Sequence, residues 1–255
     1  MAETMGLIAA MAMEARSILR RFSPWKRFRV HGLPAYRLAI AGADYVLIES
    51  GMGTDKAAAA TEALLKDVSP SSLVSFGIAG AVETGIRIGD VIVARHATSF
   101  EGGKLSDGRP LAALSQTAYR AAERALEARG VRLYVGTTIT TAGPQPPLSL
   151  LKSWMHPILD METAAIARVA AAYKIPLVSI RSISDSPDQP LPMTLEDLID
   201  ANGGMRIGHI AGRCLCHPSL LLALIRVGKN GEKAAENAAL VVAEILADTQ
   251  RSGAS

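Results

Sequence analysis

The chain has 255 residues, 49% of them hydrophobic and 20% charged, which is enough to bury a sizeable core in one or two ordinary domains. Aromatic residues make up only 4%, so the core must consist mainly of aliphatic side chains. The formal net charge is only +3, and no run of Lys and Arg alternates with aromatic residues. These features exclude a strongly basic nucleic-acid-binding protein, and no nucleic acid is expected as a partner.

The cysteines and the N-terminus indicate the compartment. Cys214 and Cys216 are separated by one residue, which makes a disulfide between them geometrically awkward. With His209 and His217 they form a cluster whose spacing differs from that of zinc knuckles, so packing is favoured and no metal is expected. We find neither a signal-peptide pattern nor an apolar run of about 18 residues. The sequence therefore predicts a cytoplasmic protein that does not span a membrane.

Short apolar runs bounded by glycine alternate with Ala-rich helical stretches, which is typical of an α/β fold with a sheet covered on both faces. Strands are predicted over residues 6–11, 35–41, 45–50, 73–79, 90–97, 131–140 and 177–183. Helices are predicted over residues 12–22, 54–67, 114–128, 162–173 and 231–247.

No long linker or fixed-period repeat interrupts the chain, so residues 1–255 are expected to form a single domain. The stretch 186–233 differs in character, because it contains Pro187, Pro190 and Pro192, a Gly-Gly pair and then a basic, apolar segment. We interpret it as a helical insertion or extension that packs on the main body.

Four segments place polar residues where predicted strands end or helices begin, the position at which open α/β sheets usually bind ligands. They are Met13-Glu14, Ser50-Gly51-Met52-Gly53, Asp160-Met161-Glu162 and Arg181-Ser182-Ile183-Ser184-Asp185. Each also has a plain structural interpretation. Asp185 could cap a turn, Glu162 could complement a helix dipole, and Glu14 could lie on a solvated helix face. Taken singly, the segments leave structure and function open.

Taken together, five segments are similar to those of one family. They are residues 6–14, 50–53, 77–80 with 88–93, 160–167 and 181–185. This set resembles the purine nucleoside phosphorylase superfamily, and more narrowly its methylthioadenosine/S-adenosylhomocysteine nucleosidase branch. The resemblance covers residues 5–189 and implies a three-layer α/β/α fold with a mixed central sheet and a C-terminal helical extension.

The resemblance implies roles for the matching residues in binding and cleaving a nucleoside. Asp185 would protonate purine N7, Glu14 would activate water, and Glu162 would hold the ribose hydroxyls. The other expected substrate-binding residues are Met161, Gly77, Ile78, Ser184 and Pro144. An N-ribosidic bond breaks through an oxocarbenium-like sugar, so a proton donor for the base and carboxylates beside the sugar make chemical sense. No cofactor is expected.

The segment Ser75-Phe76-Gly77-Ile78 bears on whether water or phosphate attacks the sugar. Bacterial phosphorylases of the superfamily place an arginine and a serine beside this glycine, and the arginine is missing here. A phosphate dianion would lack its main charge-assisted bonds and would be repelled by Glu14, so hydrolysis is favoured. A phosphate-dependent phosphorylase and a nucleoside-binding module without catalysis are the alternatives.

The C-terminal region favours an unusual substrate. Five basic residues between positions 200 and 233 surround the apolar run 220–225. The plain interpretation is a core helix, although such a helix can also lie on a bilayer or line a long apolar pocket. In its length and in its mixture of basic and apolar residues, the region is similar to that of the hopanoid-associated members of the superfamily, which remove adenine from adenosylhopane. We therefore expect a large apolar 5′ group, with residues 218–227 contacting it or a membrane. Methylthioadenosine/S-adenosylhomocysteine nucleosidase is the alternative, and the family resemblance implies a homodimer.

Overall fold

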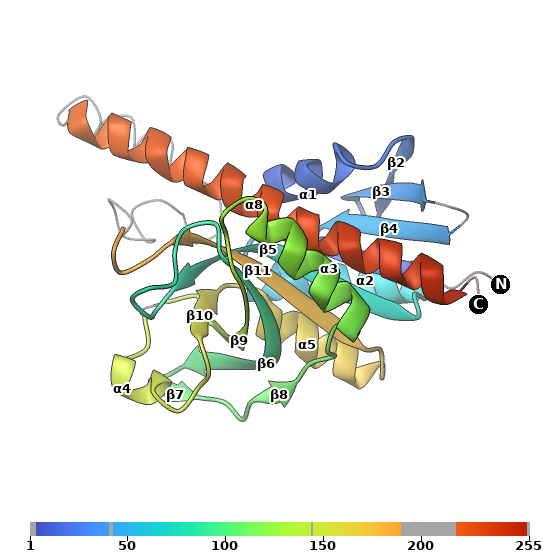
Figure 1. Cartoon of the computed structure of the whole chain (residues 1–255). Helices are drawn as coiled ribbons and strands as arrows, with labels where there is room; N and C mark the ends of the chain where they lie inside the picture. The colour runs from blue at the N-terminus through green and yellow to red at the C-terminus, as the bar shows by residue number, and fades with distance from the viewer. Residues whose placement is uncertain (1–3, 41–42, 144, 190–217, 254–255) are drawn as a thin grey trace.

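A mixed β-sheet runs through the centre of the structure, with helices on both faces (Figure 1). The protein is described by a computed structural model over residues 4–40, 43–143, 145–189 and 218–253. The strands are β1 (Met5–Ala9), β2 (Trp25–Val30), β3 (Leu33–Ile40), β4 (Ala43–Glu49), β5 (Ser72–Ala81), β6 (Val91–Glu101), β7 (Lys104–Leu105), β8 (Arg109–Pro110), β9 (Leu133–Thr140), β10 (Pro157–Asp160) and β11 (Leu177–Asp185). The helices are α1 (Ala12–Leu19), α2 (Thr54–Val68), α3 (Gln116–Glu127), α4 (Leu148–Leu151), α5 (Thr163–Ala172) and α8 (Pro218–Gly253). The expected three-layer α/β/α fold is confirmed.

The strand order brings chemically important residues to neighbouring positions. The strands follow the order β10-β9-β6-β11-β5-β1-β4-β3-β2, and β7 and β8 pair with β6. The pairs β4–β1, β1–β5 and β5–β11 are parallel, whereas β11–β6 and β2–β3 are antiparallel. β10 also pairs with β5, so this part of the sheet curls back on itself. Parallel strands end on the same side, and the segments that follow β1, β4 and β5 therefore lie close together.

Two apolar layers hold the helices against the sheet. On one face, α1, α3 and the C-terminal part of α8 bury side chains such as Ile18, Leu126 and Val242. On the other face, α2 and α5 bury side chains such as Leu64 and Ile166. These side chains are aliphatic, as the low aromatic content predicts, and full burial of one contributes about 1.5–3 kcal/mol.

The C-terminal helix differs from the sequence prediction. The structure has one helix from Pro218 to Gly253, whereas the sequence predicts a helix only from residue 231. Gly231 suggests a boundary, yet it is buried in the helix, and a Cβ at this position would lie 3.1 Å from the Met13 side chain. The glycine therefore allows close packing of α8 on α1. The cluster His209, Cys214, Cys216 and His217, with the rest of 190–217, lies outside the described residues.

Strands β2 and β10 are absent from the sequence prediction. β2 is an edge strand whose Lys26, Arg27 and Arg29 are exposed, so its apolar alternation is weak. β10 has only four residues and begins with Pro157, which is too short for a periodic signal. β10 matters for function because it ends at Asp160, directly before Met161 and Glu162.

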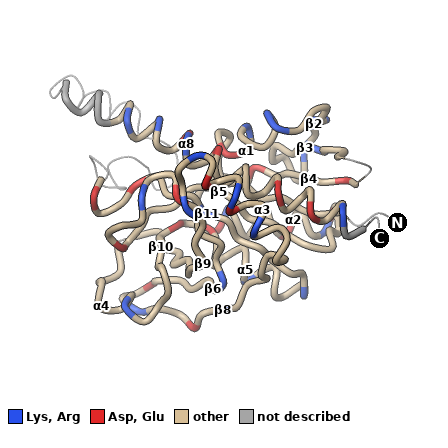
Figure 2. The backbone as a smooth tube through the Cα atoms, in the orientation of Figure 1, with Lys and Arg blue, Asp and Glu red and all other residues tan. Residues whose placement is uncertain are grey.

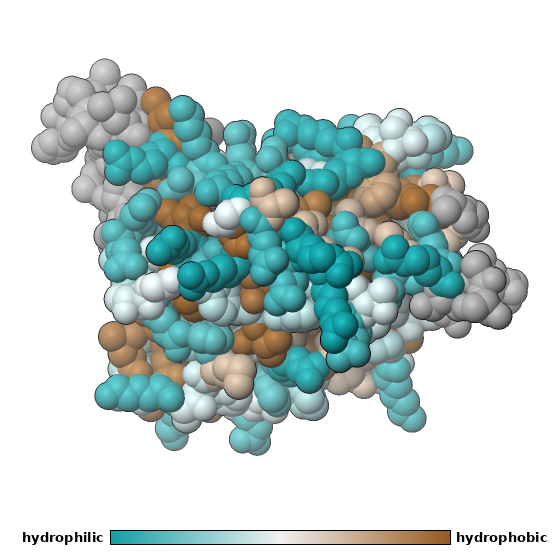
Figure 3. Space-filling model, in the orientation of Figure 1, coloured by the Kyte–Doolittle hydropathy of each residue, from teal (hydrophilic) through white to brown (hydrophobic). Residues whose placement is uncertain are grey.

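The surface is mixed in charge and carries scattered apolar side chains. Acidic and basic residues lie close together over most of the backbone, including α8 (Figure 2). Hydrophobic groups are dispersed among hydrophilic ones on the face seen in Figure 3. Exposed large apolar residues include Leu148, Met155 and Ile225. Among the described residues, no helix is both long and apolar enough to cross a bilayer.

Candidate active site

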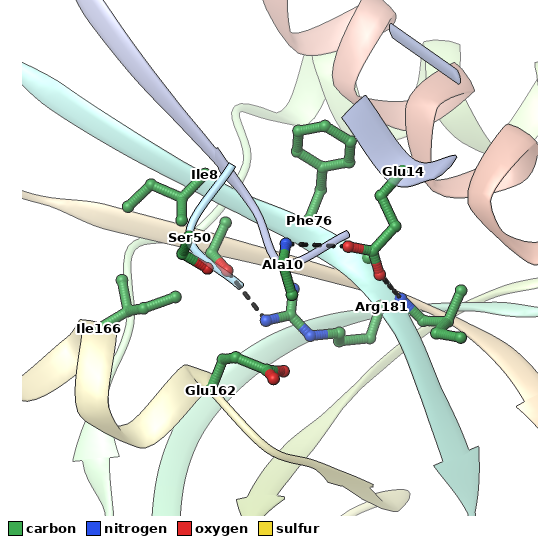
Figure 4. Close-up of a pocket in the computed structure, with 11 residues that line it drawn as sticks. Ile8, Ala10, Glu14, Ser50, Phe76, Glu162, Ile166 and Arg181 are labelled. Atoms are coloured by element: carbon green, nitrogen blue, oxygen red, sulfur yellow. Dashed lines mark hydrogen bonds between the residues drawn. The ribbon is translucent and has the colours of Figure 1, made fainter. Parts of the chain in front are cut away.

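A small pocket lies where β1 and β4 end beside β5 and β11. Its lining residues are Ile8, Ala10, Glu14, Ser50, Ser75, Phe76, Gly77, Ile78, Glu162, Ile166 and Arg181 (Figure 4). Glu14 enters from α1, Glu162 from the start of α5, and Arg181 from β11. Charged groups from three separate elements thus meet against apolar walls.

Glu14 is buried, with 2% of its surface exposed, and its carboxylate binds backbone N–H groups. Oε2 accepts from the amides of residues 10 and 11, both at 2.9 Å, and Oε1 accepts from the Ile78 amide at 3.0 Å. A Cβ on Gly77 would lie 2.9 Å from the Glu14 Cδ atom, so the missing side chain lets the carboxylate reach β5. The solvated-face interpretation of Glu14 is therefore wrong.

The environment of Glu14 changes its acidity. Burial raises the pKa of Glu14, while the backbone hydrogen bonds and the positive charge of Arg181 oppose this rise. A carboxylate with a raised pKa is a stronger base than an exposed glutamate.

Glu162 is the N-cap residue of α5 and is 8% exposed. Its Oε1 accepts a hydrogen bond of 2.8 Å from the Gly53 amide, which joins α5 to the glycine loop after β4. Gly53 has a φ of +99°, a conformation that disfavours other residues. Burial, followed by the negative charge of Asp160, raises the pKa of Glu162 to about 8, although Arg181 opposes the rise.

Asp185 ends β11 and lies against Gly80 of β5. The strand register shifts between Ile183 and Asp185, and a Cβ on Gly80 would lie 2.8 Å from Asp185 Oδ2. The Ser184 hydroxyl donates to Asp185 Oδ1 at 2.8 Å. Burial raises the pKa of Asp185, and the Ser184 hydrogen bond opposes it. Gly77, which lies beside Glu14, and Gly80, which lies beside Asp185, are three residues apart in β5, and this spacing corresponds to roughly 10 Å along a strand.

Arg181 is a site residue to which the sequence analysis assigns no role. Its side chain is buried, and Nε donates to Asp160 Oδ2 at 3.0 Å. Nη2 donates to Ser75 Oγ at 2.9 Å and to Thr163 Oγ1 at 2.8 Å. The available signal was an arginine inside a predicted strand, because an arginine in a buried strand needs a partner for its charge.

The structure brings four of the predicted site residues together in this pocket. Gly77 and Ile78 line it with both glutamates, whereas Asp185, Ser184 and Met161 are not among its lining residues. Ser184 is buried beside Asp185, and Met161 is half-buried between Asp160 and Glu162. Pro144 lies outside the described residues.

Comparison with known proteins identifies the family of this chain. The family profile of the phosphorylase superfamily matches residues 4–247. The chain belongs to the phosphorylase superfamily. This confirms the resemblance seen in the sequence. The chain is 29% identical over 213 residues to the 5′-methylthioadenosine/S-adenosylhomocysteine nucleosidase of Tolumonas auensis, covering 76% of this chain and 91% of that protein. It is 27% identical over 209 residues to a nucleosidase of the same name from Haemophilus influenzae, covering 76% and 91%.

Solved structures agree with this phosphorylase superfamily fold. The methylthioadenosine/S-adenosylhomocysteine nucleosidase of Neisseria meningitidis, in complex with methylthio-immucillin-A, superposes with a TM-score of 0.69 at 21% identity, covering 96% of this chain and 98% of that one. The futalosine hydrolase of Helicobacter pylori superposes with a TM-score of 0.70 at 16% identity, covering 97% and 100%. At these identities the likeness concerns the fold.

Proposed function

We propose that this member of the phosphorylase superfamily is a purine nucleosidase that hydrolyses the N-ribosidic bond of a 5′-modified adenosine. The observation that carries the proposal is the position of Glu14, whose carboxylate occupies three backbone N–H groups that an attacking phosphate could otherwise use. A second anion beside a buried carboxylate is strongly disfavoured, whereas water is not. The relatives named as nucleosidases support the same assignment.

In the proposed reaction, water attacks C1′ of the ribose and Glu14 takes its proton. The bond between C1′ and purine N9 breaks through an oxocarbenium-like sugar, and its electron pair goes to the base. Asp185 donates its proton to N7, so that adenine leaves as a neutral molecule; the raised pKa of Asp185 suits this role. Glu162 binds the 2′ and 3′ hydroxyls.

The remaining predicted residues complete the proposed site. Met161 and Ile78 supply apolar contacts to the sugar, and Gly77 keeps the floor of the pocket open. Ser184 orients Asp185 through the hydrogen bond to Oδ1. Pro144 is proposed to cover the base.

We propose further that the 5′ substituent is large and apolar, as in adenosylhopane. Support comes from α8, which extends beyond the sheet as one continuous helix (Figure 1). Ile225 is 48% exposed on it, next to exposed Arg226 and close to exposed Lys229. An apolar side chain beside basic ones suits a greasy ligand or the surface of an anionic bilayer. The protein would act in the cytoplasm as a homodimer, with a neighbouring subunit adding to the 5′ pocket and with peripheral membrane contact.

An adenine-release assay tests these proposals. Adenosines with 5′ groups of increasing apolar size are compared with methylthioadenosine, with and without phosphate. We expect phosphate-independent release and a kcat/KM that rises with the apolar group. A strict requirement for phosphate would instead establish a phosphorylase. A much higher kcat/KM for methylthioadenosine would assign the thioether substrate. Nucleoside binding without release over long incubation would indicate a binding module.

A further inference from the structure

Asp160 is a buried carboxylate beside the pocket that takes no part in the proposed reaction. It ends β10, is 6% exposed, and is held by three other elements. Oδ1 accepts from the Thr140 hydroxyl of β9 at 2.6 Å. Oδ2 accepts from the Thr163 amide of α5 and from Arg181 Nε of β11, both at 3.0 Å, and also from the Thr163 hydroxyl. A carboxylate with this many donors has one fixed orientation.

Arg181 is fixed through the same contact. Its other donors bind neutral acceptors, namely the Ile180 carbonyl at 3.0 Å and the hydroxyls of Ser75 and Thr163. Among these hydrogen-bond partners, Asp160 is the charged one. The guanidinium is therefore held against the pocket wall on the side shared with Glu14 and Glu162 (Figure 4).

The charges of this cluster do not balance. The charged groups are Asp160 from β10, Glu14 from α1, Glu162 from the start of α5, and Arg181 from β11. The groups that bind them from β5, β9 and α5 are neutral hydroxyls and amides. Three ionised carboxylates around one cation would bury two excess negative charges, which is costly. A cluster of this kind holds a proton more readily than separate carboxylates would.

We propose that Asp160 is a positioning residue that fixes the guanidinium of Arg181 at the pocket wall. Its negative charge also offsets part of the positive charge of Arg181, which would otherwise stabilise the ionised forms of Glu14 and Glu162. Its effect on catalysis rests on the proposed nucleosidase function, whereas the charge balance does not. Asp160 raises the pKa of Glu162, and Arg181 lowers the pKa of both glutamates. Removing the charge of Asp160 removes its repulsion of Glu162 and leaves more of the attraction between Arg181 and the two glutamates. Both effects lower the pKa of the glutamates.

The test compares Asp160→Asn with Asp90→Asn in the full chain. Asp90 is equally buried, at 3% exposed, but accepts backbone amides of Arg87 and Arg132, so its variant measures general loss of stability. Carbon-13 in the glutamate side-chain carboxyls reports ionisation without substrate, and Glu14→Gln and Glu162→Gln assign the signals. For Asp160→Asn we expect the Glu162 titration to move about one pH unit or more toward acid, and the Glu14 titration to move in the same direction through Arg181. The acid limb of the kcat/KM profile should move with them, while Asp90→Asn should shift neither.

Unchanged titrations in Asp160→Asn, or an equal shift in Asp90→Asn, would overturn the proposal. If Asp160→Asn does not fold, Arg181→Met is compared with the double variant Asp160→Asn/Arg181→Met, which leaves no unpaired buried cation. The double variant must then titrate at lower pH than Arg181→Met alone, and coincident curves would overturn the proposal. A wild-type chain that releases no adenine would refute the nucleosidase function, but the carboxyl titrations would still decide the role of Asp160.

Discussion

Gly80 of β5 allows a test of how the backbone positions Asp185. In Gly80→Ala, the new Cβ would lie 2.8 Å from Asp185 Oδ2 and 3.4 Å from Cγ, so the carboxyl must move by roughly half an ångström to reach ordinary contact. General acid catalysis contributes about 10²–10⁴-fold, and a displacement of about 1 Å can cost 10²-fold. We therefore expect kcat to fall about 10- to 100-fold. The folded state should tolerate the change, because the end of a side chain moves and Ala suits a strand slightly better than Gly.

The assay measures kcat for adenine release together with the thermal midpoint Tm. Gly228→Ala is the matched control, since Gly228 is exposed in α8 and a Cβ there meets no heavy atom within 4 Å; it should leave kcat unchanged without lowering Tm. A Gly80→Ala variant with kcat within twofold of wild type would refute the positioning argument. A large fall in Tm would show that the backbone, rather than Asp185, takes the strain.

Other predictions concern the three carboxylates. Asp185→Asn should lower kcat at least 100-fold with substrate binding still measurable, and activity within tenfold of wild type would remove Asp185 as the general acid. Glu14→Gln should slow hydrolysis to a similar extent, and restoration of turnover by added phosphate would reveal a phosphorylase site. Glu162→Ala should lower kcat/KM for a ribonucleoside more than kcat/KM for its 2′-deoxy analogue. Equal losses for the two substrates would contradict diol binding. The raised pKa of Glu162 means that the folded chain holds a proton which the unfolded chain releases near pH 4.5. This stabilisation is complete below pH 4.5 and is lost as pH rises through about 8, about 5 kcal/mol in all, so Glu162→Gln should flatten the fall in Tm over that range.

The central part of the fold could be predicted because its signals are local and repeated. Buried parallel strands such as β1 and β5 consist mostly of apolar residues, and α2 and α5 are Ala-rich with helical periodicity. Asp185 ends the strand β11, so its position at the edge of the sheet follows from the pattern, whereas Glu162 follows β10. Exposed β2 and four-residue β10 lack these signals, and the buried Gly231 looks like a helix boundary because packing against α1 is invisible in the sequence.

The contacts that set the chemistry of the site could not be predicted in the same way. Residue spacing does not show that Glu14 crosses to the Ile78 amide, or that Glu162 binds Gly53 more than 100 positions away. The pairing of Asp160 with Arg181 joins β10 to β11, and β10 itself has no periodic signal. Such contacts depend on the order of the strands in the sheet, and this order cannot be derived from the spacing of residues along one sequence.

The most direct test of the account is the fate of phosphate during the reaction. Phosphorus NMR and adenine release are followed together at saturating phosphate, first with methylthioadenosine and then with an adenosine that bears a large apolar 5′ group. Because Glu14 occupies the backbone amides beside the sugar, we predict adenine and free sugar at a rate that phosphate does not change, with no new phosphate ester signal. One sugar phosphate formed for each adenine released would contradict the account.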